Sequence, residues 1–177
     1  QPPGVWEAVA MEVSNTRNYK EDTGENLYRR SLYTFWKRAA PPALMEVFNA
    51  PSRETCTVRR ERTDTPLQAL ATLNDTQFVE AARTLAQRAL KEGGKEEARI
   101  DFMARHLLAR PLRPEENKIT EKSLDELMAH YTSAPKEAEA LIAVGDSKAD
   151  PAINPPTLAA YTMLANELLN LDEVLNK

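Results

Sequence analysis

Apolar side chains recur at intervals of three and four along most of the chain, and proline or glycine interrupts the pattern at several points. This spacing gathers apolar residues on one face of an α-helix, whereas a half-buried strand would need strict alternation. No internal repeat or Gly/Ser linker divides the pattern. The sequence therefore predicts an all-α fold: a single domain over residues 1–177, built as an irregular bundle of about six to eight helices.

Caps and helix breakers place the boundaries of these helices. Thr65 is suited to an N-cap with Pro66 at the first helical position, Asp75 can cap the following helix, and Gly93-Gly94 can end it. Residues 51–65, rich in Arg and Thr, show no helical stripe and are expected to form an ordered non-helical segment. The predicted helices or helical turns cover residues 5–11, 25–39, 43–48, 66–73, 76–92, 96–108, 114–131, 135–145 and 157–171.

Two of the predicted helices carry well-defined apolar stripes that we expect to face the core. The stripe of residues 25–39 consists of Leu27, Leu32, Phe35 and Trp36. That of residues 66–73 consists of Leu67, Leu70, Ala71 and Leu73.

Charge and hydropathy exclude two classes of partner. The net charge is −4 and the pI is near 5.4, whereas a domain that neutralises nucleic-acid phosphates is basic. The apolar runs are a few residues long, far below the roughly 20 needed to cross a bilayer. We expect neither nucleic-acid binding nor a membrane span.

The residues that usually bind metals or cofactors are sparse. His106 and His130 are the two histidines, they fall on separate predicted helices, and neither belongs to a recognised metal or haem motif. We expect no metal and no cofactor, and His106 is explained as a partner of a helix dipole. The single cysteine, Cys56, cannot form an internal disulfide and is expected to be a small buried apolar residue, because no histidine lies close by to activate it.

A basic segment stands out in this acidic chain. Residues 29–62 contain eight basic side chains and three acidic ones, a net charge of +5, which leaves −9 for the rest. Guanidinium groups bind carboxylate, phosphate or sulfate through two parallel hydrogen bonds. Two interpretations stay open: the arginines tie the segment to acidic helices or to a neighbouring domain, or they form an anion site. The candidate residues are Arg30, Arg53, Arg59, Arg60 and Arg62.

Catalytic candidates are weak. Asp75 and Glu80 could supply a carboxylate as acid or base, but capping explains Asp75 and a solvated helix face explains Glu80. We do not expect this fragment alone to be an enzyme. A sugar-stacking platform of aromatic side chains is a further possibility, although their helical spacing favours a core position. Its members would be Trp6, Tyr33, Phe35, Trp36 and Phe48.

Five long stretches together resemble one family. They read QPPGVWEAVA at residues 1–10, LYRRSLYTFWKRAAPP at 27–42, FNAPSRETCTVRRERTDTPLQALATLND at 48–75, FVEAARTLAQR at 78–88 and LLNLDEVLNK at 168–177. The chain is similar to the planctomycete-type domain of unknown function 1553. This domain is the C-terminal module of multidomain proteins that also contain cytochrome-type modules.

The resemblance implies an exported, extracytoplasmic protein with a cytochrome-like or related domain upstream and a connection to redox or polysaccharide metabolism. Because no catalytic residues are established for the family, the resemblance assigns none to this sequence. The haem-attachment motif of the upstream module is missing here, so haem binding is not carried over. The start at Gln1-Pro2-Pro3 without a methionine reads as a cut from a longer polypeptide.

Two functional hypotheses follow. The first is a non-catalytic interaction or scaffold module that packs against the upstream domains of the same polypeptide and helps to organise a redox assembly with its partner. It predicts that the basic segment is buried or paired with carboxylates. The second is part of an enzyme site acting on polysaccharide, with an arginine-lined anion pocket and Asp75 or Glu80 as acid or base.

Overall fold

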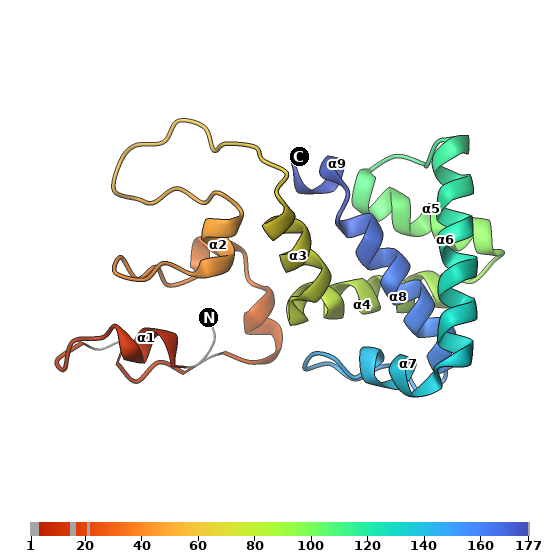
Figure 1. Cartoon of the computed structure of the whole chain (residues 1–177), viewed down its shortest axis with the longest axis horizontal. Helices are drawn as coiled ribbons and strands as arrows, with labels where there is room; N and C mark the ends of the chain where they lie inside the picture. The colour runs from red at the N-terminus through yellow and green to blue at the C-terminus, as the bar shows by residue number, and fades with distance from the viewer. Residues whose placement is uncertain (1–3, 15–16, 21, 177) are drawn as a thin grey trace. The chain divides into compact units, whose positions relative to one another are not determined.

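The computed structural model describes residues 4–14, 17–20 and 22–176, and within them all regular structure is helical, as predicted (Figure 1). Residues 1–3 and 177 lie outside the described residues. They belong to the stretches at 1–10 and 168–177 on which the family resemblance partly rests. The α-helices are α1 Val5–Ala8, α2 Ala43–Val47, α3 Pro66–Asn74, α4 Thr76–Glu92, α5 Glu96–Leu108, α6 Pro114–Ser133, α7 Pro135–Ile142, α8 Pro155–Leu169 and α9 Asp172–Leu175, and the 3₁₀ turns are Gly24–Tyr28 and Ser31–Tyr33.

Two compact units divide the chain. Unit 1 comprises residues 1–68 and unit 2 comprises residues 69–177, so that α3 begins in one and continues into the other. Each unit is described by itself below. That the whole chain acts as a single domain stays a prediction.

Helix α8 forms the centre of unit 2. It packs against α4, α6 and α7, and nine of its fifteen residues are buried, on all sides of the helix. Small side chains such as Ala82 and Ala86 on α4 and Ala165 on α8 are fully buried and let helix backbones approach closely. A helix that is apolar all round is stable only when neighbours cover it. The core of unit 2 therefore depends on α8 being surrounded.

The helix ends in unit 2 follow the local signals in the sequence. Asp75 caps α4 by accepting a hydrogen bond from the Gln77 backbone N–H, and Gly93 follows its last residue with a φ of 78°. Pro114 occupies the first turn of α6. The predicted helices over residues 76–92 and 96–108 are confirmed at both ends.

One polar stripe on α4 binds the connection between α7 and α8. Its members, Glu80, Arg83, Gln87 and Lys91, are spaced three or four residues apart and share a helix face. Glu80 accepts hydrogen bonds from the backbone N–H groups of Asp146 and Ser147, and Arg83 donates to the carbonyls of Ile142, Val144 and Ser147. Further along, Gln87 accepts from the Asp150 N–H, and Lys91 pairs with the Asp150 carboxylate at 2.6 Å. We call these four residues the α4 polar stripe.

The first two members of the α4 polar stripe form a buried ion pair. The side chains of Arg83 and Glu80 are 1% and 4% exposed, and their charged groups are 3.6 Å apart. Buried charges are tolerated when pairing and hydrogen bonds replace the water they lose. The prediction that Glu80 lies on a solvated helix face is wrong, because loop amides about 66 positions away in sequence cover it.

Helix α3 buries its polar residues and exposes its leucines. Gln68 and Thr72 are buried, whereas Leu67 and Leu70 are more than half exposed and Leu73 is 37% exposed. The buried side chains are hydrogen-bonded: Gln68 donates to the Val47 carbonyl, and the Thr72 hydroxyl pairs with Asn170. The prediction that the leucine stripe faces the core is wrong, since these polar contacts determine which face of the helix turns inward.

Trp6 organises the described part of unit 1. Its ring is 2% exposed and makes edge contacts with the rings of Tyr19 and Phe35. The indole N–H donates to the Ala40 carbonyl at 2.8 Å, and the Lys37 ammonium donates to the Trp6 carbonyl at 3.1 Å. These contacts connect α1 to residues more than 30 positions further along the chain.

The predicted helix over residues 25–39 is wrong. The structure has two short 3₁₀ turns there, joined by extended residues, and leaves Leu32 and Phe35 exposed. Tyr, Phe, Trp and Thr have lower helix propensity than Leu or Ala, and neither turn has a side-chain cap at its start. A helical stripe gains stability from a surface to pack against. Here Phe35 is the member of the stripe whose ring contacts Trp6.

An arginine clamp connects α9 to the segment between α5 and α6. Arg110 donates to the carboxylates of Glu116 and Glu173, with closest distances of 2.8 and 2.7 Å. Hydrogen bonds from Arg110 and from the Arg113 backbone lower the pKa of Glu116 from 4.5 to about 2. The same guanidinium lowers the pKa of Glu173.

A membrane span would need a long, strongly apolar helix, and the described part of the chain contains none.

Replacing Gly145 tests the contact between the α4 polar stripe and its loop. A Cβ at this position would lie 2.6 Å from the Glu80 carboxyl carbon, and the φ of +96° strains any L side chain. We expect Gly145→Ala to lower the free energy of unfolding of unit 2 by about 2 kcal/mol or more. The measurement is urea denaturation followed by helical circular dichroism. Gly94→Ala, also at positive φ but facing the small side chain of Ala98, is the control and should cost less.

The arginine clamp predicts an acid-dependent loss of stability. Because the pKa of Glu116 is lowered on folding, its stabilisation is complete above about pH 4.5 and is lost as the pH falls toward 2. We expect the difference in unfolding free energy between wild type and Glu116→Gln to shrink over this range. A difference that is the same at pH 6 and pH 2.5 would contradict the assignment. Glu121→Gln on the same helix is the control.

Candidate interaction surface

The candidate site is a long loop between α2 and α3, visible as an extended excursion in Figure 1. It covers residues 49–63 and is called the arginine loop here. Its two ends meet, because the Asn49 side-chain amide donates to the Thr63 hydroxyl at 2.5 Å. Gln68 reinforces this base by donating to both Thr63 and the Val47 carbonyl. Loops of this length with closed ends are Ω-loops, which frequently carry function.

Two contacts hold the first half of the arginine loop against the preceding segment. Arg38 forms a bidentate pair with Glu54, with distances of 2.8 and 2.6 Å. This pair lowers the pKa of Glu54 and raises that of Arg38. The Arg53 guanidinium stacks over the Trp36 ring, 4.9 Å from its centroid, on a backbone with a φ of 64°. Arg53 and Glu54 thus have partners within unit 1.

The second half of the arginine loop projects into solvent. Every residue from 51 to 62 is exposed, and Val58 is fully so. Arg59, Arg60 and Arg62 form no hydrogen bond or ion pair with the described residues. Within unit 1, the loop carboxylate Glu54 is paired with Arg38. That the remaining arginines tie the segment to acidic helices stays a prediction. Contact with a neighbouring domain stays a prediction.

Two further candidate residues of the basic segment are also at the surface. Arg30 is exposed, and its backbone carbonyl accepts the hydrogen bond that closes the turn Ser31–Tyr33. Cys56 is exposed on the arginine loop, so the prediction of a buried cysteine is wrong. The loop turns outward there, and no helix covers the side chain.

The two candidate catalytic carboxylates do not form a pair. Asp75 serves as the N-cap of α4, which confirms the capping interpretation, and Glu80 is bound by two loop amides and by Arg83. Five helical positions separate them, which places them on different sides of α4. Both carboxylates are engaged in holding the backbone.

The two histidines lie apart on helix ends. His106 shares a hydrogen bond between Nδ1 and the Phe102 carbonyl, and its Nε2 contacts Arg88 at 3.2 Å. His130 contacts Glu137 at 3.0 Å. Among the residues that the structure describes, no group of three His, Cys, Asp or Glu side chains is placed to hold a metal ion.

The aromatic side chains of unit 1 divide between core and surface. Trp6 is buried, as the core interpretation predicts, and Trp36 and Phe48 are half-buried. Tyr33 and Phe35 are 69% and 56% exposed, so the core interpretation is wrong for them. They are the residues of this group that remain open to a ligand.

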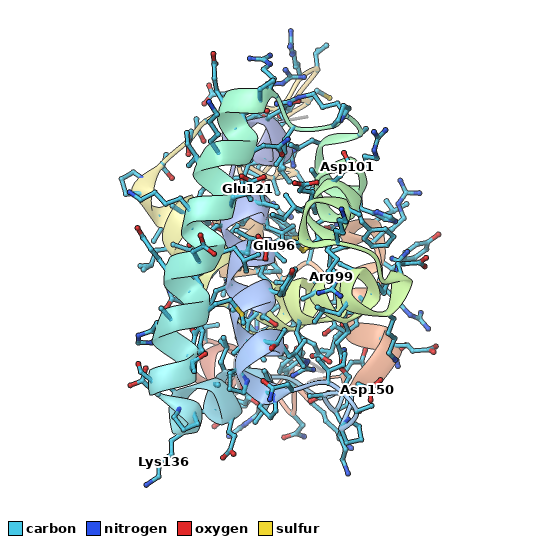
Figure 2. All side chains as sticks on the ribbon, turned by 90° about the vertical axis from the view of Figure 1, so that its right-hand side faces the viewer. Glu96, Arg99, Asp101, Glu121, Lys136 and Asp150 are labelled. Carbon is cyan, nitrogen blue, oxygen red and sulfur yellow. The ribbon has the colours of Figure 1, made fainter. Side chains whose placement is uncertain are left out.

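Sequence reasoning missed Arg83, the most completely buried charged side chain of the described structure. A signal was present, because Arg83 lies four residues after Val79 and three before Ala86, where the α4 polar stripe borders the apolar face of α4. A charge on an apolar stripe needs a buried partner. Figure 2 shows Arg99 on α5, whose side chain hydrogen-bonds the buried Tyr161 hydroxyl.

The sequence model of one family matches residues 4–124, a stretch that includes the arginine loop and ends within α6. The family is described as PSD1, Protein of unknown function (DUF1553). The chain belongs to this family. No curated protein and no solved structure matches the chain. The DUF1553 match includes the α4 polar stripe but not the α7–α8 connection that the stripe binds.

Limited proteolysis tests the exposure of the arginine loop. We expect trypsin to cut the chain after Arg59 or Arg60 about tenfold or more faster than after Arg105, which is exposed but helical, because a protease binds extended backbone. Timed digestion with mass spectrometry of the fragments is the measurement. Arg59→Gln with Arg60→Gln should remove the early cuts after these two residues and leave the cut after Arg62. A first cut within α4 to α6 would show that the loop is less accessible than described.

Proposed function

We propose that this DUF1553 domain is a non-catalytic interaction module that docks through the arginine loop onto the domains preceding it in a longer polypeptide. The assembly is an extracytoplasmic, cytochrome-associated protein of the planctomycete type, in which the module acts as a scaffold toward a redox partner. The observation that carries the proposal is the set of three uncovered guanidinium groups, those of Arg59, Arg60 and Arg62. The wider setting rests on the family resemblance.

The construction of the loop supports a docking role. Its base is closed by Asn49 and Thr63 and its first half is held by Arg38 and Trp36, so less conformational entropy is lost on binding than for a free chain. The projecting half carries arginines, which are favoured at interfaces because their planar fork matches a carboxylate. An acidic patch on the preceding domains is the complementary partner.

The engagement of Asp75 and Glu80 also supports a non-catalytic role. An acid or base must reach the proton that it transfers, and these carboxylates are hydrogen-bonded to backbone amides instead. Glu80 is in addition 3% exposed.

A second candidate is binding of an anionic polysaccharide. It is favoured by the exposure of Tyr33 and Phe35 in the same unit as the uncovered arginines. Sugar rings pack on aromatic faces, and sulfate or carboxylate groups would bind the guanidinium forks.

Calorimetric titration of the chain with its preceding domains tests the docking role. We expect Arg59→Glu with Arg60→Glu to weaken binding by about 30-fold or more, since truncating interfacial charge pairs costs on the order of 2 kcal/mol or more. In the full-length protein the early tryptic cut in the arginine loop should be suppressed. The matched control, Lys118→Glu with Lys122→Glu on α6, reverses two exposed charges outside the loop.

The outcomes separate the two candidates. Unchanged affinity in the arginine variant, or equally fast cutting of the loop in the full-length protein, would overturn the docking role. Binding of sulfated oligosaccharides that is lost in Arg59→Ala or Arg60→Ala would establish the polysaccharide candidate instead.

A further inference from the structure

A second surface of unit 1 combines exposed apolar side chains with positive charge. Residues 26–45 contain four basic residues and no acidic one, in a chain whose acidic residues outnumber its basic ones. Within this stretch, Leu32 is 77% exposed and Tyr33 is 69% exposed, directly after Arg29 and Arg30. We call residues 29–33 the apolar-basic tip. Large apolar side chains exposed in succession indicate an interaction site more strongly than scattered ones.

The apolar-basic tip projects from an anchored base. Beyond residue 34 the segment is held at several points: Phe35 packs on Trp6, Trp36 lies under Arg53, and the Ala40 carbonyl accepts from Trp6. Within the tip, backbone hydrogen bonds from Tyr33 to the Arg30 carbonyl and from Thr34 to the Ser31 carbonyl close the turn Ser31–Tyr33. The tip is therefore a short turn closed by its own hydrogen bonds, with its large side chains exposed. The residues that follow it are held by contacts with Trp6.

We propose that the apolar-basic tip binds an anionic lipid surface, with Leu32 and Tyr33 entering the interfacial region and Arg29 and Arg30 contacting headgroup phosphates. Aliphatic and aromatic side chains next to arginine are the composition of interfacial anchors, and anionic headgroups attract each nearby basic residue. The inference goes beyond the docking role of the arginine loop, because it uses other residues and holds whether or not that loop has a protein partner.

The size and chemistry of the tip favour lipid over a protein partner. A stable protein interface buries about 800 Å² on each side, which two large apolar side chains cannot supply. A lipid surface needs no shape complementarity, and a small insertion can act together with charge. Leu32 has no polar group for a sugar. No carboxylate lies among residues 26–45, and the nearest in sequence to the tip is Glu25.

Vesicle sedimentation with the full 177-residue chain tests the proposal. We expect the chain to sediment with vesicles of phosphatidylcholine containing about one-third phosphatidylglycerol, and about tenfold less with pure phosphatidylcholine at low ionic strength. Raising the salt to about 0.5 M should weaken binding, because charge attraction is screened. Inorganic phosphate at the concentration of lipid phosphate should not displace the chain, which separates a lipid surface from a free phosphate ion.

Two pairs of variants separate insertion from simple charge attraction. Leu32→Asn with Tyr33→Asn, and Arg29→Gln with Arg30→Gln, should each lower binding to the anionic vesicles by about tenfold or more. Their matched controls lie on α6: Ile119→Asn removes an aliphatic side chain that is 71% exposed, and Lys118→Gln with Lys122→Gln removes two charges. Both controls should bind like wild type. Circular dichroism and tryptophan fluorescence should be unchanged, since all substituted side chains are exposed.

Four results would overturn the proposal. The first is no sedimentation with anionic vesicles, and the second is binding that Leu32→Asn with Tyr33→Asn leaves unchanged, which would indicate charge attraction alone. The third is equal loss of binding in the α6 controls. Saturable binding to an acidic protein domain that depends on Leu32, without binding to vesicles, would assign the tip to a protein partner and reject the lipid surface.

Discussion

The buried pair of Glu80 and Arg83 is the interaction on which unit 2 of this protein depends. Two charges have been removed from water at the side of α4, and they are compensated by each other and by the backbone of the α7–α8 connection. The connection leads directly into α8, the central helix of unit 2. A polar contact thus fixes the entry of the most buried helix, and Gly145 supplies the space that it needs.

Unit 1 is stabilised differently. A single fully buried tryptophan gathers α1, Tyr19, Phe35 and Ala40, while the segments around it keep large apolar and basic side chains in solvent. Neighbouring apolar side chains that are exposed together indicate an interaction site. Both proposed partner surfaces lie on unit 1: we proposed the arginine loop for a neighbouring domain and the apolar-basic tip for a lipid surface.

Much of unit 2 could be predicted from sequence, because its helix ends are encoded by adjacent residues. Asp75, Gly93 and Pro114 act on backbone groups within one turn, so their roles can be recognised without a fold. The errors lie where a distant contact decides. Residues 25–39 have a helical stripe but little to pack against, and Glu80 looks solvated until the loop over residues 146–147 covers it.

The sequence by itself determined the helical class, both ends of α4 and α5, the net positive charge of residues 29–62 and the resemblance to the DUF1553 family, which the family match confirms. The structure ends α7 at Ile142 rather than at residue 145 and begins α8 at Pro155, inside the predicted loop. Tertiary structure alone decided which face of α3 turns inward, which charges are buried and which arginines stay uncovered. The physical reason is range: caps and periodicity act over about four residues, whereas burial depends on partners such as Asn170, 98 positions from Thr72.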